Sequence, residues 1–156
     1  FLARVVLPEK QAGARGKVAE RWPHAVLKPG PCSRLAGDLS RYFRGERVDF
    51  GAALLRGAAS SFEKRVFKAT AEIPWGEVRS YKWVAEKLGD GSAARAVGQS
   101  LGRNPWPIIV PCHRVIRSGG GLGGFSLGLD WKRRLLALEG SAVDTVAGGS
   151  GGAHFA

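Results

Sequence analysis

Apolar residues recur at helical spacing in several separate segments of the chain. The clearest segment follows Ser60, where apolar positions repeat every three or four residues up to Ile73. Ser60 followed by Glu63 matches a capping box, in which each side chain accepts from a free backbone N–H of the first turn. The pattern therefore predicts a helix from about residue 61 to residue 73, closed by the Pro-Trp-Gly turn at 74–76.

Two shorter helices are predicted next, in 81–88 and 93–102. Ser80 is expected to cap the first helix and Gly89 to end it. The second helix, AARAVGQSLG, is built from unusually small residues. Two short helices joined by a glycine-containing turn indicate a helix-turn-helix, whose second helix can approach a DNA backbone closely when its side chains are small.

The segment from 104 to 140 mixes strand and helix signals. PIIVP predicts a short buried strand, and HRVIRSGGGLGGF predicts two strands around a glycine-rich loop. DWKRRLLALEG predicts a final helix with Asp130 as its N-cap and Gly140 as its end. Glu139 then lies in the last turn, where the helix dipole disfavours a carboxylate, and this indicates that Glu139 has a partner.

The two ends of the chain are less regular. Leu35, Leu39 and Phe43 predict one helix that Gly45 ends, whereas residues 1–31 predict turns and short strands. The last sixteen residues have no periodicity and are expected to be held loosely. The composition shifts therefore predict an N-terminal domain with its linker in 1–56, a second domain in 57–140 and a tail in 141–156.

The net charge of the chain indicates what kind of partner the protein binds. Its 24 Lys and Arg residues against 13 Asp and Glu give a formal net charge of +11. Such an excess makes the compact state repel itself, so it favours a polyanionic partner, most often nucleic acid. Solubility or an anionic lipid surface remain the alternatives, although no apolar run is long enough to cross a membrane.

Other features of the composition are weaker signals. Two cysteines make a poor disulfide framework for 156 residues and favour a reducing compartment. Asn104 is the only asparagine, which together with the many arginines indicates a heat-adapted source. The scattered histidines and cysteines have no paired ligand spacing, so no metal is expected.

Cys112 and His113 are the residues best suited to covalent chemistry. A thiolate is the nucleophile, an imidazole can take the thiol proton, and a carboxylate such as Glu139 can orient the imidazole. Adjacent residues of a strand point to opposite faces, so the pair needs a bridging water or a turn, which Pro111 favours. From these residues alone, a buried structural cysteine and histidine remain the alternative.

Residues 61–140 closely resemble the C-terminal domain of the O6-alkylguanine-DNA alkyltransferases, also called methylated-DNA–protein-cysteine methyltransferases. PCHRV is the family's active-site motif, and IPWGEVRSY, ARAVGQSLGRNP, GGLGGFSLG and LLALEG surround it in family order. Upstream, LSRYFRGERVDF resembles the family's helix before the linker. The resemblance implies an α/β protein, with a small N-terminal α/β domain of the ribonuclease H-like type. Its C-terminal domain would be mainly helical, with a winged helix-turn-helix-like motif.

The resemblance also implies an activity, direct-reversal DNA repair without a cofactor. Cys112 would accept the alkyl group from O6 of guanine, and also from O4 of thymine, in one irreversible transfer. His113 would be the water-relayed base, and Glu139 would hold its tautomer. Tyr81 would donate a hydrogen bond to guanine N3, and Asn104 would tie the helix-turn-helix to the active-site strand. From the residues alone, a core tyrosine and a helix C-cap remain open for the last two.

The resemblance further implies that the damaged base leaves the duplex, because O6 lies within a stacked base pair. Arg95 would enter the gap, although a surface arginine on a phosphate is the alternative from sequence alone. The DNA-binding residues would be Arg95, Ala93, Ala94, Ala96, Gly98 and Arg103. The pocket residues would be Val115, Phe125, Ser126 and Trp106, with Phe125 in place of a common tyrosine.

The expected partner is therefore double-stranded DNA containing O6-alkylguanine, bound by a monomer away from membranes. The expected location is the cytoplasm and nucleoid of a prokaryote, or the nucleus of a eukaryote. Cys32, His24 and His154 do not make the zinc set of some relatives. Two alternatives are a non-catalytic protein that binds alkylated DNA and a Cys-His-Glu hydrolase. The charge and the small-residue helix favour repair.

Overall fold

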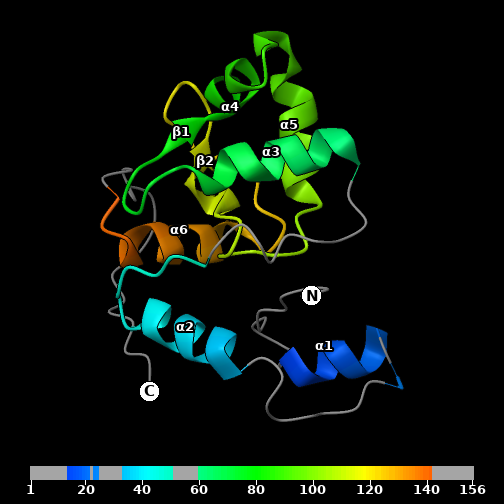
Figure 1. Ribbon diagram of the computed structural model, residues 1–156, viewed down its shortest axis with the longest axis vertical. Helices are drawn as coiled ribbons and strands as arrows, with labels where there is room; N and C mark the ends of the chain where they lie inside the picture. The colour runs from blue at the N-terminus through cyan, green and yellow to red at the C-terminus, as the bar shows by residue number, and fades with distance from the viewer. Residues whose placement is uncertain (1–13, 22, 25–32, 51–59, 142–156) are drawn as a thin grey trace.

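The computed structural model describes residues 14–21, 23–24, 33–50 and 60–141. This part of the chain is mostly helical and carries one small parallel sheet. Its α-helices are α1 (Ala14–Arg21), α2 (Ser33–Phe43), α3 (Ser61–Ala71), α4 (Tyr81–Lys87), α5 (Ala94–Gly102) and α6 (Leu129–Leu138). Figure 1 shows α3, α4, α5 and the sheet on one side of α6, with α2 on the other side.

Helix α3 confirms the predicted capping box. The Glu63 backbone N–H donates to the Ser60 hydroxyl at 3.2 Å, and the Ser60 N–H donates to the Glu63 carboxylate at 3.0 Å. The helix ends at Ala71, two residues earlier than predicted, while Ile73 still enters the core. The buried face of α3 is Val66, Phe67, Ala69 and Thr70.

Helices α4 and α5 confirm the predicted helix pair. The Ser80 hydroxyl accepts from the Trp83 N–H at 3.0 Å, and Gly89 follows the helix with a φ of 90° that favours glycine. A short 3₁₀ helix, η2 (Gly91–Ala93), makes the turn between them. Both helices pack against α3 through one shared core, to which Val84, Ala85, Val97 and Leu101 contribute.

The predicted strands of 107–125 are wrong in their pairing. PIIVP holds only an isolated bridge between Pro107 and Val110, because a proline has no N–H for a ladder and Ile108 adopts a φ of 76°. The strand β2 (Val115–Ile116) pairs in parallel with β1 (Arg79–Ser80), not across the glycine-rich loop. The segment that follows Cys112 is therefore anchored to the entry of α4.

Two further predictions need correction. Asp130 does not cap α6: Gly128 is the N-cap, and Asp130 lies in the first turn, 3.5 Å from Arg133. Residues 14–21 form helix α1 where turns were predicted, because this charged segment has no apolar period to reveal it. The other residues of the predicted N-terminal domain up to 32, except 23–24, and the tail after 141 lie outside the described residues.

Helix α2, predicted from its apolar spacing, packs beside α6 around Tyr42. This tyrosine is fully buried in a cluster with Ile108 and Leu135. Its ring meets Phe43 and Trp75 edge-on, with ring centroids 5.5 and 5.2 Å away. This second cluster contacts the segment around Cys112, because Tyr42 lies 3.4 Å from His113 and Ile108 belongs to the cluster. None of the described helices is long and apolar enough to span a membrane.

Candidate active site

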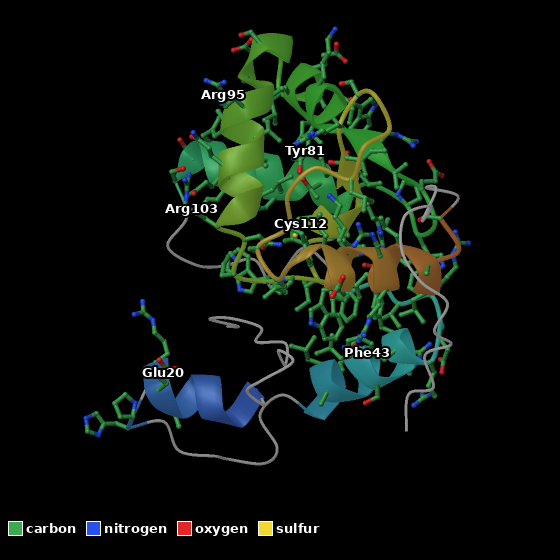
Figure 2. The ribbon with its side chains drawn as sticks, turned by 180° about the vertical axis from the view of Figure 1, so that it is seen from behind. Glu20, Phe43, Tyr81, Arg95, Arg103 and Cys112 are labelled. Atoms are coloured by element: carbon green, nitrogen blue, oxygen red, sulfur yellow. The ribbon has the colours of Figure 1, made fainter. Side chains whose placement is uncertain are left out.

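A cavity of about 760 Å³ opens between α4, α5 and the glycine-rich loop. Seven of the predicted site residues line it: Tyr81, Ala94, Arg95, Gly98, Cys112, Phe125 and Ser126. Figure 2 shows Cys112 at the inner end, Tyr81 beyond it and Arg95 farther out on α5. Residues more than forty positions apart in the sequence thus form one cavity, as the resemblance implied.

Cys112 begins a short 3₁₀ helix, η3 (Cys112–Arg114). Cys112 and His113 therefore lie on a turn and not on a strand, as their cooperation requires. The cysteine is only 5% exposed, although it lines the cavity. Burial raises the pKa of its thiol, while the hydrogen bond from Asn104 and the charge of Lys132 act in the opposite direction. The thiol is therefore protonated near neutral pH and needs a base before it can attack.

Asn104 holds the cysteine from behind the cavity. Its amide nitrogen lies 3.0 Å from the carbonyl oxygen of Val110 and 3.1 Å from the sulfur of Cys112. Its amide oxygen accepts from the Trp106 N–H at 2.9 Å. The side chain therefore joins the end of the helix-turn-helix to the active-site segment and also donates to the sulfur, a contact that the sequence did not predict.

His113 points away from the cavity into a buried polar cluster. Its Nε2 lies 2.8 Å from Oε1 of Glu139. Burial acts to raise the pKa of Glu139, but hydrogen bonds from His113 and Arg114 outweigh it and lower this pKa to about 2. An ionised carboxylate only accepts hydrogen bonds, so Nε2 carries the imidazole proton.

The other imidazole nitrogen is free to act as a base. His113 Nδ1 is buried and has no hydrogen-bond partner in the part of the chain that the structure describes. Burial lowers the pKa of His113 despite the opposing influence of Glu139, so the ring is neutral at neutral pH. A neutral imidazole with its proton on Nε2 can take the thiol proton at Nδ1.

Three buried polar residues near the cavity were missed as site residues by sequence reasoning. Arg114 donates to both carboxylate oxygens of Glu139, from Nε at 2.7 Å and from Nη2 at 2.9 Å. Tyr42 of α2 donates to Oε1 of Glu139 at 2.7 Å. Lys132, buried in α6, is the third. Its place on the apolar face of α6, three positions before Leu135, was the available signal for a buried cation.

Lys132 fixes the wall of the cavity. Its ammonium group donates to the carbonyls of Val115, Leu122 and Gly124 and thereby holds the glycine-rich loop against β2. Burial lowers the pKa of Lys132 to about 8, with Cys112 acting to raise it. The carbonyl of Val115, which was predicted as a pocket residue, thus already accepts a hydrogen bond from this lysine.

Tyr81 lies between α5 and the glycine-rich loop. A Cβ at Gly98 would lie 3.7 Å from its ring, and a Cβ at Gly123 would lie 2.9 Å from both the ring and the hydroxyl. The hydroxyl lies 3.4 Å from the Gly124 carbonyl. Burial raises the pKa of Tyr81, and so does the nearby Cys112, so the phenol stays protonated and available as a donor.

Several predicted residues lie outside the cavity lining. Arg103 is exposed on the surface and pairs with Glu63 at 2.9 Å. Trp106 is buried edge-on against Phe67, 5.9 Å between ring centroids, so the structure does not support it as a pocket residue. The remaining predicted residues outside the lining are Ala93, Ala96 and Val115, together with the supporting Asn104, His113 and Glu139.

The cavity has further lining residues, namely Lys82, Gln99, Leu101, Gly102 and Arg117, together with Ser118, Gly123 and Gly124 of the glycine-rich loop. Among the described residues, no group of three His, Cys, Asp or Glu side chains could hold a metal ion.

Taken together, the fold and the site define a helix-turn-helix protein with a buried cysteine–histidine–glutamate cluster beside a cavity.

Comparison with known proteins identifies the family to which the chain belongs. Residues 61–141 match the DNA-binding domain described as 6-O-methylguanine DNA methyltransferase. A methylated-DNA–protein-cysteine methyltransferase of Mycobacterium tuberculosis is 48% identical over 117 residues, covering 74% of this chain and 70% of the relative. One of Methanopyrus kandleri is 50% identical over 107 residues, covering 69% and 79%. The chain therefore belongs to the methylated-DNA–protein-cysteine methyltransferase family.

Solved structures agree with this assignment. The crystal structure of Mycobacterium tuberculosis OGT in complex with DNA matches with a TM-score of 0.70 and 46% identity, covering 74% of this chain and 70% of that chain. The O6-methylguanine-DNA methyltransferase of the hyperthermophilic archaeon Pyrococcus kodakaraensis matches with a TM-score of 0.61 and 30% identity, covering 81% and 74%. The similarity extends to mycobacteria as well as archaea, so it does not support a heat-adapted source.

Proposed function

We propose that this protein repairs alkylated DNA by transferring an alkyl group from O6 of guanine to its own Cys112. The observation that supports the proposal is the position of Cys112, which lines the same cavity as Tyr81 and is followed by His113 with a free imidazole nitrogen. Figure 2 shows Cys112 and Tyr81 near each other. Family membership and the DNA complex of the mycobacterial relative support it. O4-alkylthymine, which presents its alkyl carbon in the same way, is a second substrate of this proposal.

The transfer is a single displacement. The thiol proton of Cys112 passes to His113 Nδ1, relayed by water, and Glu139 stabilises the imidazolium that forms. The sulfur then bonds to the alkyl carbon as the bond between that carbon and O6 breaks, with its electron pair moving onto the guanine. A proton returns to the released base. The S-alkylcysteine product is a stable thioether, so each chain acts once.

Tyr81 assists the leaving group in this account. Charge develops on the guanine as the carbon–oxygen bond breaks, and a hydrogen bond from the phenol to N3 stabilises it. The raised pKa of Tyr81 keeps the phenol protonated, so it donates a hydrogen bond throughout the reaction. The ring lies on the cavity wall that Gly98 and Gly123 leave open.

The damaged nucleotide must leave the duplex to reach Cys112, because the sulfur lies inside a protein cavity. Arg95, exposed on α5 at the cavity, would fill the gap in the stack. Ala94 and Gly98 line the same side, and their small size lets α5 approach the minor groove closely. Readout in that groove is degenerate, which suits a protein that must find lesions in any sequence.

The proposal also assigns a role to each part of the chain. Residues 57–140 carry the chemistry and the DNA contacts, residues 1–56 supply a supporting α/β domain, and residues 141–156 take no part in the transfer. The protein acts as a monomer, because one chain supplies every residue named in the reaction.

The test is the intact mass of the protein after incubation with duplex DNA containing O6-methylguanine. Transfer predicts one added methyl group per chain, lost in the Cys112→Ser variant, while Ser118→Ala, a change on the same cavity wall, keeps it. A protein that only binds lesions would retain its original mass. A hydrolase would show repeated turnover of an ester substrate, and either result would contradict the proposal.

A further inference from the structure

A residue of α2 contacts the buried cluster behind the cysteine. Tyr42 is fully buried, and its hydroxyl donates to Oε1 of Glu139 at 2.7 Å. The same hydroxyl oxygen lies 3.4 Å from Nε2 of His113. Tyr42 precedes these residues by 97 and 71 positions, outside the matched DNA-binding domain of 61–141.

We propose that Tyr42 is a positioning residue for alkyl transfer, through which α2 sets the orientation and charge of the Glu139–His113 pair. The inference rests on the proposed function, since it concerns the base that activates Cys112. It assigns a catalytic consequence to a residue that contacts neither the cavity nor the reacting sulfur.

The hydrogen bonds of Glu139 show how the hydroxyl acts. Oε1 accepts from the Tyr42 hydroxyl, from Nε2 of His113 and from Nη2 of Arg114, while Oε2 accepts from Nε of Arg114. Three residues thus donate to the carboxylate, and together they resist its rotation away from the imidazole. The imidazole therefore keeps its proton on Nε2 and leaves Nδ1 free for the thiol proton.

Packing alone does not require the hydroxyl. The Tyr42 ring fits edge-on against Phe43 and Trp75, which a phenylalanine at this position would satisfy equally well. Burial, together with the neighbouring Glu139 carboxylate, raises the pKa of Tyr42 far above its ordinary value. The phenol consequently stays neutral near neutral pH and donates to the Glu139 carboxylate.

The charges around His113 determine the sign of the expected effect. Glu139 favours the imidazolium, Arg114 and Lys132 disfavour it, and Cys112 adjoins it in the sequence. The Tyr42 hydroxyl withdraws negative charge from the oxygen that faces Nε2. Its removal strengthens the attraction between Glu139 and the imidazolium, so the pKa of His113 rises in a Tyr42→Phe variant.

The test compares single-turnover methyl transfer by full-length wild type and Y42F over roughly pH 5 to 9. We expect transfer to slow by about tenfold at neutral pH, the rate effect of losing a hydrogen bond to a charged group. We also expect the inflection of the rate profile to move to higher pH. Affinity for the DNA should stay unchanged, because Tyr42 does not line the cavity.

The control is F43L, which removes a neighbouring ring of the same cluster and leaves the hydroxyl in place. It should lower the thermal midpoint and keep the wild-type pH profile. Rates are compared at a temperature where circular dichroism shows all variants folded. A Y42F profile with the wild-type inflection would overturn the inference, whatever its rate, because a merely structural role changes stability alone.

A double-mutant cycle adds a second, independent readout. If Tyr42 acts through Glu139, Y42F should slow transfer much less in an E139Q background than in the wild type. Equal slowing in both backgrounds would also overturn the inference. Failure of the wild type to gain a methyl group would instead contradict the proposed function, so the two failures are distinguishable.

Discussion

The two sides of Cys112 are built differently. The cavity side consists of partly exposed surfaces of α4, α5 and the glycine-rich loop, where small residues such as Ala94 and Gly98 leave room. The inner side is buried and polar: Asn104 donates to the sulfur of Cys112, while the Glu139 carboxylate accepts from His113 and Arg114. Under the proposed function, the cavity side would bind the DNA and the base, while the inner side would set the reactivity of the thiol and contribute to stability.

The largest effect is expected from the inner side, at Arg114. An Arg114→Met change keeps the volume but leaves the Glu139 charge buried without its cation. Breaking a buried ion pair in this way should lower the free energy of unfolding by about 3–5 kcal/mol. The measurement is urea denaturation. Arg117→Met, on the exposed cavity rim, is the matched control, and an equally small loss in both variants would contradict the buried-cluster account.

The dependence of folding stability on pH also tests the buried cluster. The pKa of Glu139 lies at about 2 in the folded protein, below its ordinary value of 4.5. A lowered carboxyl pKa contributes stability above the unfolded value and loses it as the pH falls through the folded value, here between 4.5 and 2. The loss should be about 3 kcal/mol. Glu139→Gln should flatten this part of the stability curve, and an unchanged curve would show that the carboxylate is not ionised in the cluster.

An intermediate effect is expected on the cavity side, at Gly123. An alanine here would place its Cβ 2.9 Å from the Tyr81 hydroxyl and ring, at a φ of 70°. Stability should fall by about 1–2 kcal/mol because the left-handed conformation disfavours a Cβ, and transfer should slow as Tyr81 is displaced. Gly124→Ala, with open space around its Cβ, is the control. Equal transfer rates in the two variants would remove Tyr81 from the mechanism.

The smallest effect on stability is expected at Arg103. Its side chain is 64% exposed and pairs with Glu63, so Arg103→Ala should change the free energy of unfolding by less than about 1 kcal/mol. If it contacts a phosphate, the salt dependence of DNA binding should lose about one unit of slope. Arg44→Ala, a similarly exposed arginine paired with Glu46, serves as the control. Identical slopes in both variants would place Arg103 outside the DNA interface.

The sequence predicted the elements that depend on local contacts better than those that depend on distant contacts. Helix α3 and the α4–α5 pair follow local rules, so apolar spacing and the caps at Ser60 and Ser80 predicted them. No comparable local rule predicts the conformation of the proline-containing segment 105–111 or of the glycine-rich loop. The parallel pairing of Val115 with Arg79 depends on contacts distant in the sequence, and the predicted strand pair was therefore wrong.

The candidate site divides in the same way. The motif around Cys112 and the resemblance identified the residues that line the cavity, such as Tyr81 and Phe125. Tyr42 and Lys132 were missed because their partners, Glu139 and the Val115 carbonyl, are distant in the sequence, so a position on an apolar helix face suggests burial without showing what the polar group binds. The unfavourable position of Glu139 was the one local signal that a partner existed, and the structure supplies that partner.

The most direct test of the account is to find where the alkyl group is attached. After reaction with duplex DNA containing O6-methylguanine, the protein is digested and its peptides are sequenced by mass spectrometry. The account predicts a single methyl group on the sulfur of Cys112 and none on Cys32, the other cysteine of the chain. A methyl group on any other residue, or unmodified Cys112 beside repaired DNA, would contradict it.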